Sequence, residues 1–225
     1  ICADYASNDI KCEVEGDYDF NEIGEYKLKY VATDPYDNKT YKDFILYVKE
    51  KPKYTPKPVE TEPNYIYFSD VLEEHKNENT LVGIDISRFN GDINFEEVRD
   101  AGCEFVIIRL GWFIDNELGL DYKYKEYIEA AHDAGLKIGL YFYSEATTIE
   151  DVEKTVDFII NNIPYKIDMP IAYDWEDFND YNSYNISLYN FNNLAHTFIN
   201  MINENGYKGI LYGSKYYLLN IWDVK

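Results

Sequence analysis

The sequence is poor in basic residues, and this shortage excludes several kinds of partner. Its 225 residues include 42 aspartates and glutamates against 21 lysines and arginines, which gives a formal net charge of −21 at pH 7. A chain this acidic repels the phosphates of nucleic acid and the headgroups of anionic membranes. It also has no apolar run of about eighteen residues, the length that a membrane-spanning helix requires. We therefore expect neither a nucleic-acid partner nor insertion into a membrane.

Cysteine and histidine are scarce as well, which limits metal and redox chemistry. The three cysteines form no CxxC pair, and the three histidines are scattered. No GxGxxG or GxxxxGK[ST] motif is present to support nucleotide binding. We predict no cofactor, no metal, and a buried free thiol at Cys103. A disulfide between Cys2 and Cys12 is compatible with the sequence but is not required by it.

Residues 1–50 have the pattern of a small β domain. Residues 26–32 alternate and are rich in β-forming side chains, residues 34–39 supply a turn, and residues 44–48 follow as a second strand. This pattern predicts a small antiparallel sandwich. The first residues have the character of mid-strand residues, so we expect the sequence to begin inside a longer protein.

Residues 51–80 are predicted to be a proline-rich linker and a lead-in to the next domain. Four prolines in a polar stretch favour an extended spacer. Near residues 71–76 a short helix and an extended path both fit the sequence.

Residues 81–225 have a different pattern, in which apolar runs of strand length alternate with helical patterns. This alternation is typical of βα units around a parallel sheet, so we predict an α/β fold. At this point an open sheet and a barrel are both compatible with it. Strands are predicted at residues 81–87, 105–112, 137–144, 169–176 and 209–214.

Polar side chains gather at the C-terminal ends of these strands, the edge where ligands bind in either architecture. On an extended chain Asp174 and Glu176 point to one side and Trp175 to the other. Asp85 ends the first strand, and in a barrel it would share their pocket. Close carboxylates raise the pKa of at least one partner. Further candidates near this rim are Arg109, Trp112, Tyr141, Tyr143 and Tyr212.

Carboxylates ringed by aromatic side chains suit a sugar substrate, because paired acids hydrolyse glycosidic bonds through an oxocarbenium-like transition state. One alternative is that Asp174 and Glu176 are only solvent-exposed charges at the end of the strand. The apolar strand before them and the third acid, Asp85, argue against it. The other is a divalent-cation site, which ranks second without histidine or an aspartate-rich loop.

Five stretches resemble, in order, the motifs of the glycoside hydrolase family 25 lysozymes, the N-acetylmuramidases of the Chalaropsis type. Asn90 stands where that family commonly has glutamine, and Phe95 where it has tryptophan. Residues 24–40 resemble the bacterial Ig-like repeats of cell-surface proteins, with Asp37 in place of a turn glycine. The five stretches are GIDISRFNGDINF at 83–95, FVIIRLG at 105–111, AGLKIGLYFYS at 134–144, PIAYDWE at 170–176 and GYKGILYGS at 206–214.

The resemblance implies an irregular TIM-like β/α barrel that hydrolyses the β-1,4 bond from N-acetylmuramic acid to N-acetylglucosamine in peptidoglycan. Glu176 would be the general acid, and Asp174 the companion that holds the substrate acetamido group or stabilises the transition state. Asp85 would be a further active-site acid, with Tyr143 and Tyr212 as substrate contacts. The family pattern continues beyond the final residues here, so we expect the parent domain to be longer at its C-terminus.

We therefore expect a monomeric bacterial enzyme, secreted or attached to the cell wall, with the peptidoglycan glycan strand as its partner. A non-catalytic glycan-binding protein on the same barrel is the main alternative, and the presence of Asp85, Asp174 and Glu176 together favours the enzyme. A chitinase-like hydrolase is the third, opposed by the absence of a DxxDxDxE motif before Asp174.

Overall fold

The computed structural model describes residues 3–50, 66–165 and 167–223, which divide into two compact units. One unit combines the N-terminal part of the chain with residues 179–189, and the other contains residues 66–178 and those from 190 onward. Most of the predicted proline-rich linker, at residues 51–65, lies outside the described residues.

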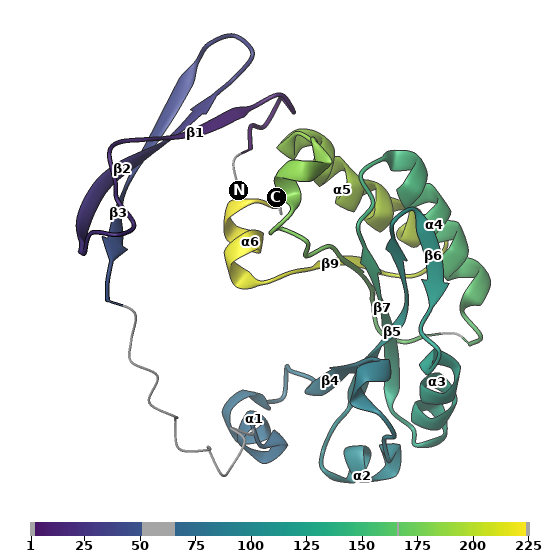
Figure 1. The fold of residues 1–225 in the computed structure, drawn as a ribbon. Coiled ribbons are helices and arrows are strands. Elements are labelled where there is room, and N and C mark those ends of the chain that lie inside the picture. Colours follow the sequence, from purple (N-terminus) through teal and green to yellow (C-terminus); the bar gives the residue numbers. More distant parts are fainter. Residues whose placement is uncertain (1–2, 51–65, 166, 224–225) are drawn as a thin grey trace. The chain divides into compact units, whose positions relative to one another are not determined.

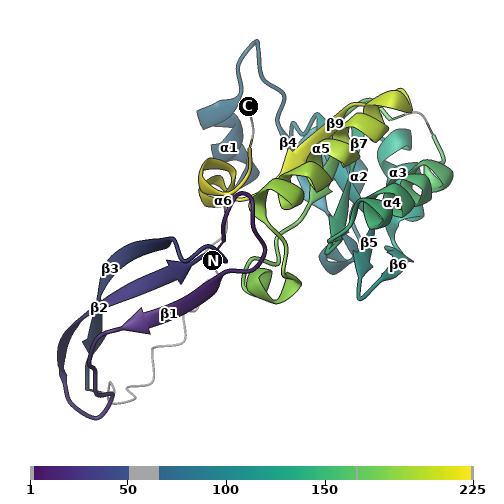
Figure 2. The same ribbon diagram turned by 90° about the horizontal axis from the view of Figure 1, so that it is seen from above.

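The first unit contains an antiparallel sheet in the order β1 (Lys11–Glu15), β2 (Gly24–Thr33), β3 (Lys39–Val48), shown side by side in Figure 2. The predicted strands and turn are confirmed. Asp37 occupies the left-handed region at φ 63°, which explains why the resembling repeats have glycine there. Residues 3–50 form this single sheet, and a second sheet facing it, which a sandwich requires, is not among them. Cys12 is disulfide-bonded, whereas Cys2 lies outside the described residues.

The second unit is built on a parallel sheet in the order β4, β5, β7, β8, β9, so the α/β prediction is confirmed. Strand β6 pairs antiparallel with β5, a hairpin that the sequence reading missed. Its turn residues Asp115 and Asn116 both have positive φ, as a two-residue type I′ hairpin requires. The strands are β4 (Gly83–Ile86), β5 (Phe105–Ile114), β6 (Glu117–Leu120), β7 (Lys137–Ser144), β8 (Ile171–Asp174) and β9 (Gly209–Tyr212).

Helices follow the strands as the capping residues predict. The side chain of Asn94 accepts hydrogen bonds from the first amides of α2, and Thr148 accepts one from the Asp151 amide of α4. Figure 1 shows α3, α4 and α5 on the outer side of the curved sheet. The helices are α1 (Phe68–His75), α2 (Phe95–Asp100), α3 (Tyr124–Asp133), α4 (Ile149–Asn162), α5 (Leu188–Glu204) and α6 (Lys215–Asn220), with short 3-10 turns η1 (Arg88–Asn90) and η2 (Tyr181–Tyr184).

The core lies between the sheet and these outer helices. Val106, Ile108 and Leu110 of β5 are completely buried on that side, while Ile107 on the inner face is partly exposed. Within the described residues β4 and β9 each pair with a single neighbour, so the parallel strands form an open curved sheet. A closed barrel therefore remains a prediction for the parent domain. No helix among the described ranges is long and apolar enough to span a membrane.

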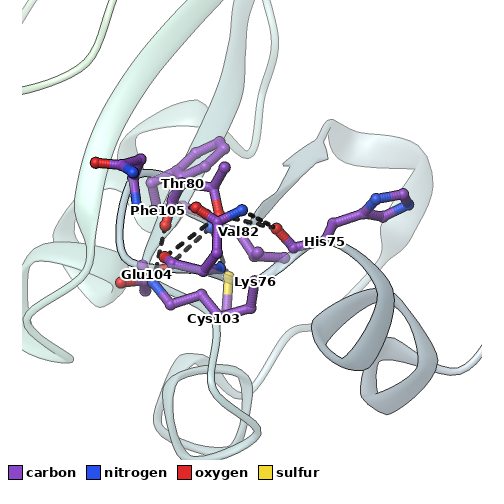
Figure 3. Close-up of polar contacts among 9 residues, drawn as sticks. His75, Lys76, Thr80, Val82, Cys103, Glu104 and Phe105 are labelled. Atoms are coloured by element: carbon purple, nitrogen blue, oxygen red, sulfur yellow. Dashed lines mark hydrogen bonds and ion pairs between the residues drawn. The ribbon is translucent and has the colours of Figure 1, made fainter.

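The lead-in to this unit is helical at α1, which decides between the two paths that the sequence allows. Figure 3 shows how it is attached: Lys76 Nζ donates to Thr80 O (2.9 Å) and to Glu104 Oε2 (2.5 Å). The same Glu104 oxygen accepts a hydrogen bond from the Val82 amide (3.0 Å). The residues before β4 and β5 are thereby held together. Cys103 beside them is a buried free thiol, as predicted.

Candidate active site

The inner face of the parallel sheet carries a cavity of about 400 Å³, which extends to the C-terminal ends of β8 and β9. The structure places Asp85, Asp174 and Glu176 together around this cavity, although they come from two strands that are not neighbours. Two of the predicted aromatic contacts, Tyr141 and Tyr212, share the lining. The apolar part of the wall is formed by Ile84, Phe105, Ile107, Pro170, Ala172 and Ile210.

Local packing around β8 directs the acids into the cavity. Tyr173 points to the outer side, where its ring lies 4.9 Å from that of Phe198 on α5. Trp175 is completely buried on that side and donates a hydrogen bond from Nε1 to Ala146 O (3.2 Å). Alternation then turns Asp174 and Glu176 inward. Trp175 is therefore a core residue that orients the strand end and not a surface for substrate.

The two carboxylates on this strand have different surroundings. Asp174 is 5% exposed, and its Oδ1 is buried without a hydrogen-bond partner among the described residues. Burial, followed by the neighbouring charges of Glu176 and Asp85, raises the pKa of Asp174 to about 7, against a lowering contribution from Arg109. Burial also raises the pKa of Glu176, whose side chain is more exposed. The site thus holds carboxyl groups that keep a proton at a higher pH than ordinary acids.

A register row of aromatic and acidic residues crosses this edge. Trp112, Tyr143, Asp174 and Tyr212 stand opposite one another on β5, β7, β8 and β9. A bulge between Arg109 and Gly111 shifts the register of β5. Because of this extra residue, Trp112 and Arg109 share the inner face although three positions separate them.

Tyr143 and Trp112 do not line the cavity itself and have other partners. The Tyr143 hydroxyl donates to Glu145 Oε1 (3.2 Å), and burial raises the pKa of Glu145, with a further contribution from Asp177. Trp112 packs under the guanidinium of Arg88, which lies 4.6 Å from its ring centroid. Sequence reasoning missed Glu145, although its place directly after an apolar strand matches the signal that identified Asp174.

Arg109 is held by a carboxylate that the sequence reading also missed. Its Nε and Nη2 donate to Asp121 Oδ2 at 2.9 and 2.8 Å, and the Asp121 side chain is 1% exposed. Asp121 Oδ2 accepts the Arg88 amide as well (3.1 Å), and Oδ1 accepts that of Lys123 (3.0 Å). The ion pair occupies Arg109 with a protein partner, so its effect on the cavity is through its charge.

The alternative function predicted for this edge, a divalent-cation site, requires metal-ligating side chains grouped around one point. Among the described residues no group of three or more histidines, cysteines, aspartates or glutamates has the geometry of a metal site. What the cavity offers is a buried carboxyl group, a more exposed one beside it, and a third across the sheet. Such a set can give and take protons on a bound molecule.

Comparison with known proteins places this chain in a family. The family described as glycosyl hydrolases family 25 matches residues 84–225, which is more than half of the chain. The chain belongs to this family.

One curated relative is the autolytic lysozyme of Clostridium acetobutylicum, 33% identical over 97 residues, or 43% of this chain and 28% of that protein. The chain thus matches under a third of that relative's length. The structure of a family 25 glycosyl hydrolase from Bacillus anthracis is similar with a TM-score of 0.55 and 21% identity, over 67% of this chain and 69% of that one. The modular autolysin LytC from Streptococcus pneumoniae, solved with a synthetic peptidoglycan ligand, is similar with a TM-score of 0.50 and 23% identity, over 60% and 33%. These structural similarities show the fold.

Proposed function

We propose that the chain is a lysozyme of the N-acetylmuramidase type, which hydrolyses the β-1,4 bond between N-acetylmuramic acid and N-acetylglucosamine in peptidoglycan. The observation that carries this proposal is the convergence of Asp85, Asp174 and Glu176 on one cavity in a family 25 fold. The names of the relatives, a lysozyme and an autolysin bound to a peptidoglycan ligand, support the substrate class.

In the proposed reaction Glu176 is the general acid. Its raised pKa retains a proton for the leaving oxygen of the glycosidic bond, and its exposure gives that oxygen access. As the bond from the anomeric carbon to that oxygen breaks, a water molecule adds its oxygen to the anomeric carbon. The water keeps one proton as the new hydroxyl and gives the other to a carboxylate of the site. Positive charge on the sugar ring in the transition state is stabilised by the surrounding carboxylates.

Asp174 is proposed as the companion carboxylate. Its side chain lines the cavity, where a substrate acetamido N–H is a suitable donor to the carboxylate. That hydrogen bond would favour the ionised form of Asp174 once substrate is bound. Asp85, on β4, is proposed as a further active-site acid. Tyr141 and Tyr212 are proposed as substrate contacts.

For the protein as a whole we propose a monomer that acts outside the bacterial cell or on its wall. Residues 1–50 would be an Ig-like module and residues 51–80 a linker to the muramidase domain at residues 81–225. The antiparallel β2–β3 pair and its Asp37 turn support the Ig-like assignment. The names of the autolytic relatives support the location.

The test is the clearing of a suspension of purified peptidoglycan. The parent protein and a Glu129→Gln control, altered at an exposed acid on α3, are expected to clear it at equal rates. Glu176→Gln is expected to clear it at least about 100-fold more slowly. Equal clearing by Glu176→Gln and the parent would contradict the assignment. Retention on insoluble peptidoglycan without clearing by any variant would favour the glycan-binding alternative.

A further inference from the structure

Arg88 differs from the other two arginines of the chain in how its guanidinium is engaged. Arg99 pairs with Asp100 (2.7 Å) and Arg109 with Asp121 (2.8 Å). The side chain of Arg88 forms no ion pair or hydrogen bond with any residue that the structure describes. Its main chain is engaged instead: the amide donates to Asp121 Oδ2, and the carbonyl accepts the Gly91 amide. Arg88 therefore has its side-chain donors available near a cavity that three acids line.

Aromatic rings hold this guanidinium in place. It lies 4.6 Å from the ring centroid of Trp112 and 5.0 Å from that of Phe89. Phe89 is 77% exposed, and the guanidinium of Arg109 lies 4.9 Å from its ring. A cation stacked on aromatic faces keeps its in-plane N–H groups directed outward. The Arg88 fork is thus oriented without a carboxylate partner.

The turn that carries Arg88 and Phe89 is fixed by its own hydrogen bonds. The Ser87 amide donates to Asn90 Oδ1 (2.9 Å), and the Phe89 amide donates to Ser87 Oγ (3.4 Å). Ser87 and Asn90 also form a capping box around η1. The half-buried Arg88 and the exposed Phe89 therefore stand on a defined piece of backbone.

This turn lies close to the proposed catalytic acids. Arg88 follows Asp85 by three positions at the end of β4. Trp112 is in register with Tyr143, and Tyr143 with Asp174, so two strand spacings separate Trp112 from Asp174. At about 4.8 Å per spacing this is roughly 10 Å along the same sheet edge.

We propose that Arg88, Phe89 and Trp112 form a subsite for a carboxylate-bearing part of the glycan strand. The inference rests on the proposed function and specifies the substrate that the site prefers. A guanidinium fork binds a carboxylate through two parallel hydrogen bonds, and the adjoining rings offer flat apolar surface to a sugar. The nearby acids repel an anionic substrate, and Arg88 offsets that repulsion at one defined place. Peptidoglycan supplies such carboxylates on its stem peptides and, where the peptide is absent, on the lactyl group.

Binding is tested in the Glu176→Gln background, so that strands are not cut during the measurement. Three soluble ligands are compared: strands with stem peptides, strands stripped of peptide, and stripped strands with their carboxylates reduced to alcohols. Quenching of tryptophan fluorescence follows binding, because Trp175 and Trp222 are buried whereas Trp112 is partly exposed. The added changes are Arg88→Gln, the charge-retaining Arg88→Lys, and Arg99→Gln as the control.

Arg88→Gln is expected to raise the Kd for carboxylate-bearing strands about tenfold, with Arg88→Lys between it and the parent. Reduced strands should bind all variants equally, and Arg99→Gln should match the parent throughout. A loss confined to stripped strands identifies the lactyl carboxylate as the ligand, and a loss confined to peptide-bearing strands identifies the stem peptide. An unchanged Kd for every ligand, an equal loss on reduced strands, or no binding by any variant would overturn the subsite.

The parent protein's hydrolysis of the same strands separates this inference from the proposed function. If the unaltered protein hydrolyses the strands, but adding Arg88→Gln to Glu176→Gln leaves the Kd unchanged, the subsite fails and the function stands. If carboxylate binding depends on Arg88 but the parent hydrolyses nothing, the subsite stands and the function fails.

Discussion

Arg109 donates both of its hydrogen bonds to one carboxylate oxygen of Asp121, and that oxygen also accepts the Arg88 amide. The ion pair is almost fully enclosed, with side-chain exposures of 12% and 1%. A single acid thus joins the turn after β4 to the inner face of β5. It fixes a positive charge that lowers the pKa of Asp174 against the effects of burial and of the neighbouring acids.

Replacing Asp121 by asparagine should destabilise the protein by about 3 kcal/mol, because Arg109 is left buried with its charge unpaired. The matched control is Asp100→Asn, which breaks the surface pair with Arg99 and should cost less than about 1 kcal/mol. Urea unfolding monitored by circular dichroism gives both free energies of unfolding. Equal losses for the two variants would show that Asp121 has no special structural role.

Replacing Asp174 by asparagine should stabilise the fold in a pH-dependent way. The pKa of Asp174 is raised from 3.8 to about 7, so folding disfavours its ionised form. The penalty is absent below the unfolded pKa, grows as the pH rises, and levels off above the folded pKa. It amounts to at most about 4 kcal/mol.

Unfolding experiments at pH 3 and pH 8 measure this effect. The Asp174→Asn variant should match the parent at pH 3 and exceed its stability at pH 8. Asp133→Asn, at an exposed acid on α3, should show no such difference. A stability gain for Asp174→Asn of the same size at both pH values would contradict the buried-carboxyl account.

The pH dependence of hydrolysis should report Glu176. A general acid must be protonated, and burial raises the pKa of Glu176 above its ordinary value of 4.5. The rate should therefore persist above the ordinary range of a glutamate and then fall as Glu176 loses its proton. Because Glu176 and Asp174 are coupled, the apparent pKa values in kcat against pH belong to the pair. A rate that already falls within or below the ordinary glutamate range would rule out this role for Glu176.

Gly119 is expected to be required for the position of Trp112. A Cβ atom at this position would lie 2.5 Å from Cε2 of the Trp112 ring, so Gly119→Ala must displace that ring. We expect a shifted tryptophan emission spectrum and weaker binding of glycan strands, with the fold retained. Gly24→Ala in β2 is the control, since its nearest contact would be 3.7 Å away. Unchanged emission and affinity in Gly119→Ala would show that Trp112 is not held as described.

Much of the fold was predictable because its signals are local. Asn94 and Thr148 mark helix starts by satisfying free amides, and an apolar run followed by alternating acids marks the end of β8. These features depend on neighbours in sequence. The β5–β6 hairpin also has a local signal, the Asp115–Asn116 turn, which lies inside what otherwise has the pattern of a single βα unit.

The partners of individual site residues were not predictable in the same way. Arg109 and Asp121 meet across a hairpin whose existence was not foreseen, so the burial of that pair had no signature in sequence. Trp175 belongs to the core because its ring contacts those of Phe178 and Phe191. Such outcomes depend on contacts between distant segments, which periodicity does not specify.

The most direct test of the central claim is the identity of the new reducing end. Purified peptidoglycan is digested with the parent protein, and the new reducing ends are reduced with borohydride. The product is then hydrolysed in acid, and the sugar alcohols are identified by mass spectrometry. Cleavage of the muramic acid bond predicts muramitol, formed by the parent and by Glu129→Gln but not by Glu176→Gln. Glucosaminitol as the product, or muramitol formed equally by Glu176→Gln, would contradict the account.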